Sequence, residues 1–117
     1  TRPGDEIIVA DPVYSPTRLL TENFLKEFNI KTIFYNPSDL KTLEKNITKK
    51  TKLIFVENPG SNSFEFQDLG KIILIAKKNK IFTAIHTISS QSNLALTCQL
   101  CQRLSIIQDI QMLWVEV

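Results

Sequence analysis

Two cysteines and one histidine are the first side chains whose types and spacing could do chemistry. Cys98 and Cys101 have the C-x-x-C spacing of zinc-ligand pairs and of redox motifs. A zinc site takes four ligands, and His86, the only histidine, leaves such a set one ligand short. A redox pair would begin a helix directly after a strand. The sequence therefore favours a chance spacing, and we predict no metal ligands.

Acidic and basic side chains offer two further groups. Glu57 and Glu65 lie near the end of an apolar run, where paired carboxylates could serve in acid–base chemistry. A structural or solvated role is more common for such acids, and we favour it here. Lys77, Lys78 and Lys80 could bind phosphate, but they end a predicted helix, where lysines suit the negative end of the helix dipole. Neither group predicts a catalytic centre.

Four short apolar runs must position these side chains, and each has the length of a strand. The runs are continuous rather than alternating, which is typical of strands covered on both faces by helices. The sequence therefore predicts an α/β fold with a doubly wound, mostly parallel sheet. The predicted strands are residues 6–10, 31–35, 52–56 and 81–85.

Helix signals lie between these runs. Ser15 and Pro16 predict an N-cap followed by proline at the first helical position, and Asn29 predicts the end of that helix. Ser38 and Asp68 predict the caps of two further helices. Each helix has an apolar face at helical spacing. These faces are Leu20, Phe24 and Phe28 beside Leu25; Leu40, Leu43 and Ile47; and Leu69, Ile72, Ile73 and Ala76.

Ligands of doubly wound sheets bind at the carboxyl ends of the strands, so functional candidates follow residues 9, 56 and 85. The segments at these places resemble the pyridoxal-phosphate enzymes of cysteine and methionine metabolism, the trans-sulfuration enzymes, and cystathionine β-lyase in particular. The resemblance covers residues 2–85 without a gap, and the order and spacing of its motifs are specific. The motifs are Pro3-Gly4-Asp5, Asp11-Pro12-Val13-Tyr14 with Thr17-Arg18, Thr51-Lys52-Leu53-Ile54-Phe55 with Glu57-Asn58-Pro59-Gly60, and Glu65 with Asp68-Leu69.

The resemblance implies the large domain of the type I pyridoxal-phosphate transferase fold, and it assigns a role to Tyr14. In the family this tyrosine stacks on the cofactor ring; Arg18 matches a family arginine without an assigned role. An aspartate after the fourth strand pairs with the pyridine nitrogen and makes the ring an electron sink. Here His86 follows Ile85, and a neutral imidazole would hold that proton less well. The family's Schiff-base lysine follows about two dozen residues later, but this chain has no lysine after Lys80.

The composition changes near residue 86. Residues 1–85 contain 23 charged residues, whereas residues 86–117 contain three, together with five of the six glutamines. A shifted reading frame explains the change. If residues 102–106 are written as CAG CGA CTA AGT ATA, reading from the third base gives Ala-Thr-Lys-Tyr, the family's sequence around its lysine. We therefore predict a short deletion after Ile85, a partial pyridoxal-phosphate large domain over 1–85 and a frameshifted tail over 86–117.

These observations predict a truncated, frameshifted remnant of a cystathionine β-lyase-like carbon–sulfur lyase without catalysis. We expect no catalytic residues and a vestigial stacking role for Tyr14. The resemblance places the start of the chain after the family's phosphate-binding loop and its end before the C-terminal domain, so we expect no bound pyridoxal phosphate. The ancestral substrate is then a sulfur amino acid such as cystathionine.

Two other roles stay open. The chain could be an interaction module that pairs with an intact homologous subunit, or a small enzyme or binding protein with a new role. A net charge of +2 is too small to indicate nucleic acid. The sequence contains no apolar run near the ~20 residues of a membrane span. Two cysteines make no disulfide framework, so we expect a cytoplasmic protein.

Overall fold

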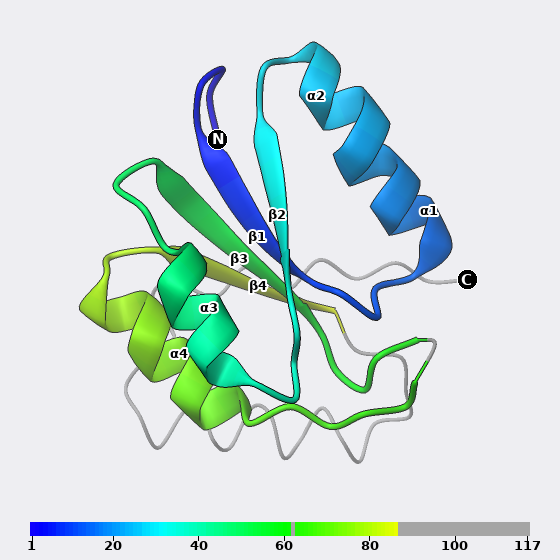
Figure 1. Cartoon of the computed structure of the whole chain (residues 1–117), viewed down its shortest axis with the longest axis vertical. Coiled ribbons are helices and arrows are strands. Elements are labelled where there is room, and N and C mark those ends of the chain that lie inside the picture. Colours follow the sequence, from blue (N-terminus) through cyan, green and yellow to red (C-terminus); the bar gives the residue numbers. More distant parts are fainter. Residues whose placement is uncertain (62, 87–117) are drawn as a thin grey trace.

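A four-stranded parallel sheet with helices on both faces forms the part of the chain that the computed structural model describes, residues 1–61 and 63–86 (Figure 1). The spatial order of the strands is β2-β1-β3-β4, and all three pairings are parallel. The predicted α/β architecture is confirmed, and each strand lies within one residue of its predicted bounds. The strands are β1 (Glu6–Ala10), β2 (Lys31–Tyr35), β3 (Thr51–Glu57) and β4 (Phe82–His86).

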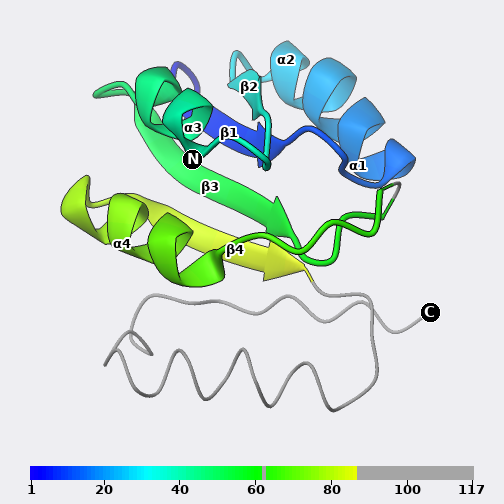
Figure 2. The same ribbon diagram turned by 60° about the horizontal axis from the view of Figure 1, so that its bottom comes forward.

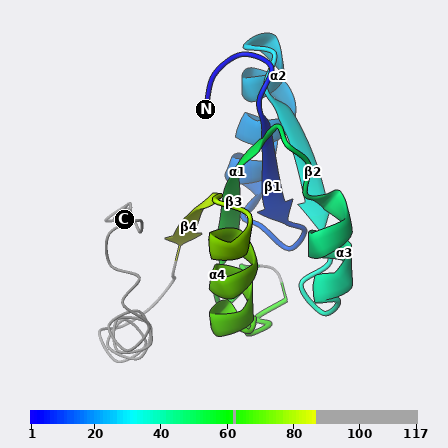
Figure 3. The same cartoon turned by 90° about the vertical axis from the view of Figure 1, so that its left-hand side faces the viewer.

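The helices divide between the two faces of the sheet as the strand order requires. The step from β1 to β2 runs in the opposite direction to the steps from β2 to β3 and from β3 to β4, so right-handed crossovers place their helices on opposite faces. Figure 3 shows α3 and α4 in front of the sheet and the segment α1 to α2 behind it. The helices are α1 (Ser15–Leu19), the π-helical η1 (Leu20–Phe24), α2 (Leu25–Glu27), α3 (Leu40–Asn46) and α4 (Leu69–Lys78).

The larger core lies between the sheet and helices α3 and α4. Its centre joins Ile8 and Ile54 of the sheet to Leu43 of α3 and Ile72 of α4, all four of them fully buried. The predicted apolar face of α4 is confirmed, since Leu69, Ile72, Ile73 and Ala76 are all buried. Its predicted cap is confirmed as well, because a carboxylate oxygen of Asp68 accepts a hydrogen bond from the backbone N–H of Lys71.

A smaller core lies between the sheet and the continuous helical segment α1–η1–α2. It contains the buried Ile7, Val9, Val13 and Ile30, with Leu25 partly buried against them. The predicted apolar face of this segment is only partly used. Leu20, Phe24 and Phe28 are each about half exposed, whereas the polar Thr21 is buried.

Two of the predicted helix caps are wrong by one residue. Ser15 is the first residue of α1, and Tyr14 takes the cap position without a side-chain hydrogen bond. Asp39, not Ser38, caps α3 and accepts from the N–H of Lys41 at 3.0 Å. The backbone N–H of Ser38 instead donates to the side chain of Asn36, and this short turn delays the helix by one residue.

The end predicted for the first helix is confirmed. Asn29 adopts φ 57°, the left-handed conformation that ends many helices. No helix among residues 1–61 and 63–86 is long and apolar enough to cross a membrane. The predicted tail, with Cys98 and Cys101, lies almost entirely outside the described residues, since His86 alone of its members is described.

Candidate functional site

Glu57, the last residue of β3, connects three segments at the carboxyl edge of the sheet. Its side chain is 1% exposed. One carboxylate oxygen, Oε2, accepts from the backbone N–H of Tyr14 at 2.7 Å, and the other, Oε1, accepts from the hydroxyl of Ser61 at 2.6 Å. His86 approaches the same Oε1 with its Nδ1 at 3.0 Å. The carboxylate therefore fixes the segment after β1, the loop after β3 and the end of β4 to one another.

His86 ends β4 directly beside Glu57 in the strand register. Because an ionised carboxylate only accepts hydrogen bonds, a hydrogen bond between the two side chains places a proton on Nδ1 of His86. The side chain is 31% exposed. His86 thus stands at the position that the resemblance assigns to a family aspartate, and its Nδ1 is already engaged by Glu57.

Tyr14, the predicted stacking residue, lies at the same edge. Its backbone is held by Glu57, while its side chain is about half exposed. An exposed aromatic ring beside a buried carboxylate can offer one face to a flat ligand. Stacking on a cofactor ring stays a prediction for this residue.

The polar contacts of Arg18 are to Asp11 and Glu22, in the segment after β1. Its guanidinium donates to the carboxylate and to the carbonyl of Asp11, and it pairs with Glu22 at 3.0 Å. It also lies over the ring of Phe34, 4.1 Å from the ring centroid. Burial opposes its charge, but the hydrogen bonds to Asp11 and Glu22 outweigh burial and raise the pKa of Arg18. The side chain therefore stabilises the turn after β1.

Gln67 and Tyr35, which the sequence patterns did not single out, hold the carbonyl of Glu57 at this edge through hydrogen bonds. The amide of Gln67 donates to the carbonyl of Glu57 at 2.9 Å and accepts from the hydroxyl of Tyr35 at 2.5 Å. Its backbone N–H donates to the side chain of Asn58 at 2.8 Å. Burial raises the pKa of Tyr35. A polar residue two places before a buried helix start was the signal that could have pointed to Gln67.

The remaining candidates lie elsewhere. Glu65 is exposed and contacts Ser38 at 3.5 Å, so Glu57 and Glu65 do not form an acid pair. Lys77, Lys78 and Lys80 are exposed at the carboxyl-terminal end of α4, as predicted for a solvated cluster. Among residues 1–61 and 63–86, no three acidic, cysteine or histidine side chains gather in a group that could hold a metal ion.

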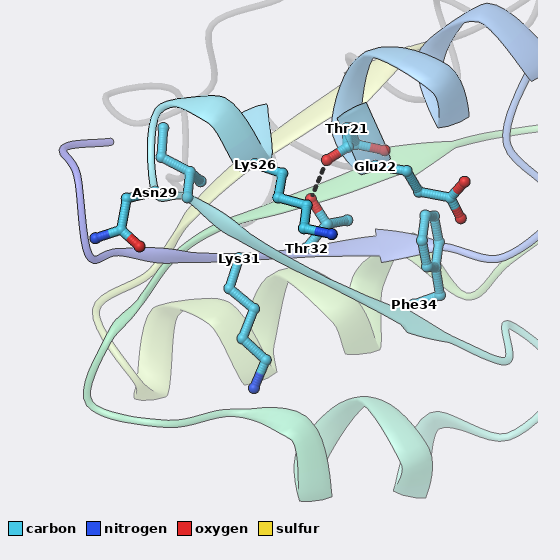
Figure 4. A pocket seen from close by; sticks show the side chains of 8 residues that line it. Thr21, Glu22, Lys26, Asn29, Lys31, Thr32 and Phe34 are labelled. Carbon is cyan, nitrogen blue, oxygen red and sulfur yellow. Dashed lines mark hydrogen bonds between the residues drawn. The ribbon is translucent and has the colours of Figure 1, made fainter. Parts of the chain in front are cut away.

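A hollow of about 510 Å³ lies along the edge strand β2 (Figure 4). Glu22 and Lys26 line it from the helical segment, and Lys31 and Thr32 line it from β2. The hydroxyl of Thr32 donates to the carbonyl of Thr21 at 2.9 Å across its inner wall. The hollow shares no residue with the Glu57 cluster and lies away from the carboxyl edge where the sequence places its candidates.

The side chains that the structure describes at the carboxyl edge do not by themselves fit pyridoxal phosphate as a catalytic cofactor. Tyr14 offers a face for the ring, but the cofactor also needs a carboxylate on its pyridine nitrogen and a lysine on its aldehyde. Glu57 is buried and already accepts from Tyr14 and Ser61. No lysine hydrogen-bonds to any member of the described Glu57 cluster.

Comparison with known proteins accounts for the fold. A model of the family described as Cys/Met metabolism PLP-dependent enzyme matches residues 1–110. A candidate cystathionine β-lyase of Saccharomyces cerevisiae is 40% identical over 85 residues, which are 73% of this chain and 25% of that protein. The cystathionine β-lyase of Staphylococcus haemolyticus is 36% identical over 97 residues, covering 80% of this chain and 25% of that protein.

A solved structure agrees with these relatives. The cystathionine γ-lyase of Lactobacillus plantarum, solved in complex with L-serine, superposes with a TM-score of 0.71 and 30% identity, over 73% of this chain and 22% of that one. The chain thus spans about a quarter of the length of the relatives that it matches. On its fold and its sequence, this chain belongs to the family of pyridoxal-phosphate-dependent enzymes of cysteine and methionine metabolism and resembles its cystathionine β-lyases.

Proposed function

We propose that this chain is a non-catalytic remnant of a cystathionine β-lyase-like enzyme. The observation that carries the proposal is the state of Glu57 and His86. The carboxylate that could face a cofactor is buried and accepts from two neighbours, and an imidazole stands beside it where the family has an aspartate. The chain also has no lysine after Lys80, whereas the family's Schiff-base lysine follows the fourth strand. Loss of the aspartate or of the lysine alone lowers the catalytic rate by orders of magnitude.

The proposal includes three finer statements. Residues 1–85 are a partial cofactor-binding domain, and residues 86–117 are the product of a shifted frame. Tyr14 keeps the position of a ring-stacking residue without holding the cofactor, because an aromatic contact of roughly 1 kcal/mol does not secure binding alone. The ancestral substrate was a sulfur amino acid such as cystathionine, and the protein is cytoplasmic.

The test is a titration of the purified chain with pyridoxal phosphate, followed by the visible absorbance of an aldimine. We expect no saturable, one-to-one aldimine, only slow and unsaturable reaction with the 11 lysines. Cystathionine should yield no pyruvate above a protein-free blank. The cystathionine β-lyase of Staphylococcus haemolyticus is the positive control. A saturable aldimine together with pyruvate release would overturn the proposal.

A second role is association with a homologous polypeptide. Aromatic and aliphatic side chains that stay exposed on one side of the sheet favour it. The two roles are compatible, because a chain without catalysis can still pair with an intact homologous subunit.

A further inference from the structure

The outer edge of β2 carries backbone groups that no other strand of the described sheet reaches. β2 lies at one margin of this sheet, with α2 and α3 beside it (Figure 2). Along a strand, the N–H and C=O groups of successive residues point to opposite edges. The N–H of Lys31 donates to the carbonyl of Asp5, and the carbonyl of Tyr35 accepts from the residue that follows β1. Thr32 and Phe34 therefore direct their backbone groups away from β1, to the outer edge.

Side chains of α3 cover part of this edge. The amide of Asn46 donates to the carbonyl of Phe34 at 3.4 Å, and the hydroxyl of Thr42 accepts from the N–H of Asn36 at 3.3 Å. Among the described residues, no hydrogen bond is made to the N–H or the carbonyl of Thr32, or to the N–H of Phe34. The amino-terminal half of the outer edge is therefore open, whereas its carboxyl-terminal half is capped.

Lysines stand on both faces of the open half. Lys26 lines the hollow, and none of the carboxylates in the described part of the chain pairs with its ammonium. Glu22, the acid of the same hollow, already pairs with Arg18 at 3.0 Å. Lys31 extends on the α3 side of the strand (Figure 4); its side chain is 68% exposed, and its ammonium lies 3.6 Å from the carboxylate of Glu6. An acidic ligand along this edge can therefore meet a lysine on either face.

We propose that the open half of the β2 edge binds an extended acidic segment of another polypeptide, which adds as a further strand beside Thr32 and Phe34. In this mode of recognition, backbone hydrogen bonds provide affinity and pockets for alternate side chains provide specificity. Residues directly opposite one another in a sheet point to the same face. The residue opposite Thr32 therefore enters the hollow towards Lys26, and its neighbour, opposite Lys31, lies on the other face. Two successive acidic residues match both lysines.

A second copy of this chain matches the edge less well. Antiparallel pairing of two β2 edges about a two-fold axis brings the lysines of one copy close to those of the other, and like charges on neighbouring strands are destabilising. Lysine on an edge strand is also a common means of preventing edge-to-edge association. An acidic strand replaces this repulsion by attraction, so the charge of the edge selects the partner.

The probe is the amidated hexapeptide Thr-Val-Glu-Glu-Val-Thr with a fluorophore at its amino terminus. Its sequence reads the same in both directions, so it presents two glutamates to Lys26 and Lys31 in a parallel or an antiparallel pairing. Titration with the full 117-residue chain, followed by fluorescence anisotropy, should show saturable one-to-one binding that weakens as salt is raised.

Two control peptides separate charge from backbone pairing. The peptide with lysines in place of both glutamates should not bind. The peptide that is N-methylated at its first glutamate and its second valine should not bind either, because alternate N–H groups point to one edge of a strand and these two face β2 in either direction.

Thr32→Pro tests the backbone contact from the side of the protein. The N–H of Thr32 takes no part in the pairing with β1, so proline is compatible with this edge position. The variant loses the outward N–H and the hydroxyl that donates to Thr21, and we expect peptide binding to weaken about tenfold. Thr32→Val is the matched control, because it loses the same hydroxyl but keeps the N–H; it should change binding by less than about twofold.

Lys26→Glu tests the charge of the hollow. Reversal of this charge should weaken binding of the peptide about fivefold, since an exposed attraction becomes a repulsion. Lys77→Glu makes the same change in net charge at the exposed end of α4, and it should change binding by less than about twofold.

Circular dichroism of each variant checks that the fold is kept. Absence of saturable binding to the folded chain overturns the proposal, as does equal binding of the glutamate and lysine peptides. Equal weakening by Thr32→Val and Thr32→Pro also overturns it, because the backbone N–H would then carry no affinity. If Thr32→Pro does not fold, binding of the N-methylated peptide decides the same point.

A chain that associates with itself until Thr32→Pro separates it would assign the edge to a second copy and overturn the proposal. The edge of β2 shares no residue with the Glu57 cluster, so the inference goes beyond the proposed function and is tested independently of the aldimine titration.

Discussion

Glu57 and His86 form the last register pair of the β3–β4 ladder, and the Nδ1 atom of His86 lies 3.0 Å from Oε1 of Glu57. The pair joins the carboxyl ends of two neighbouring strands. The N–H of Tyr14 and the hydroxyl of Ser61 donate to the same carboxylate, so the four residues form one hydrogen-bonded cluster. The consequences can be tested one residue at a time.

Replacing Glu57 should destabilise the chain strongly. Glu57→Leu leaves the N–H of Tyr14 and the imidazole of His86, both part-buried, without their acceptor, and an unsatisfied group costs about 1–3 kcal/mol when it is buried and less when water reaches it. We expect the free energy of unfolding in urea to fall by roughly 3 kcal/mol. Glu65→Leu is the control, because Glu65 is exposed and should change stability by about 0.5 kcal/mol or less. Equal effects for both variants would show that the Glu57 cluster carries no special stability.

The buried hydroxyl of Tyr35 should make stability fall at alkaline pH. Burial raises its pKa above the ordinary value of 10.0, so the folded chain keeps a proton that the unfolded chain loses. Stability is therefore complete below pH 10 and declines as the pH rises above it. Urea unfolding between pH 8 and pH 11 measures the decline.

Two single variants separate the two tyrosines. Tyr35→Phe should remove the alkaline decline, at a cost of about 1 kcal/mol near neutral pH because the amide oxygen of Gln67 loses its donor. Tyr14→Phe is the control and should leave stability near neutral pH unchanged, since that side chain is half exposed. A decline that persists in Tyr35→Phe would assign it to other groups.

The cap of α4 should contribute stability that disappears in acid. Hydrogen bonds from Lys71 lower the pKa of Asp68 below its ordinary 3.8. A lowered carboxyl pKa stabilises the folded chain above the unfolded pKa, and this stabilisation is lost as the pH falls through the folded pKa. Asp68→Asn keeps a cap but loses the charge. We expect it to be less stable than the parent by about 0.5 kcal/mol at pH 6, because the pair is exposed, and we expect this difference to shrink as the pH falls below 3.8.

Two glycines should respond to alanine with opposite signs. Gly4 has φ +94°, where a Cβ atom is strained, and its N–H donates to the carbonyl of Asn29. Gly4→Ala should therefore cost about 1 kcal/mol. Gly70 lies in the first turn of α4, where an added Cβ meets only ordinary contact, so Gly70→Ala should stabilise the chain by about 0.5 kcal/mol. Thermal unfolding of the two variants against the parent gives both signs in one experiment.

The coding sequence offers a test that needs no protein. We expect the frame that starts at the third base of codon 101 to read Ser-Ala-Thr-Lys-Tyr, the family's sequence around its lysine. Stop codons in that frame, or unrelated residues there, would remove the frameshift explanation for residues 86–117. The structural proposals for residues 1–86 do not depend on this result.

The sequence by itself determined the elements of the described part. Continuous apolar runs predict buried parallel strands because the helices on each face leave no polar side, and β1 to β4 follow these runs within one residue. Asp68 and the face from Leu69 to Ala76 were predictable because capping and helical spacing are local properties. The motifs around Tyr14 and Glu57 identified the family for the same reason, since each is a short contiguous segment.

Only the tertiary structure decided which residues of different elements contact one another. Glu57 and Tyr14 are 43 residues apart, and their hydrogen bond depends on the strand order β2-β1-β3-β4, which no local pattern encodes. Spacing showed that Leu20, Phe24 and Phe28 share a face, but burial depends on a neighbouring element, and here the sheet contacts the flank that carries Thr21 and Leu25. The periodicity of a helix fixes which side chains share one face of that helix. The direction of the crossover fixes which face of the sheet the helix covers.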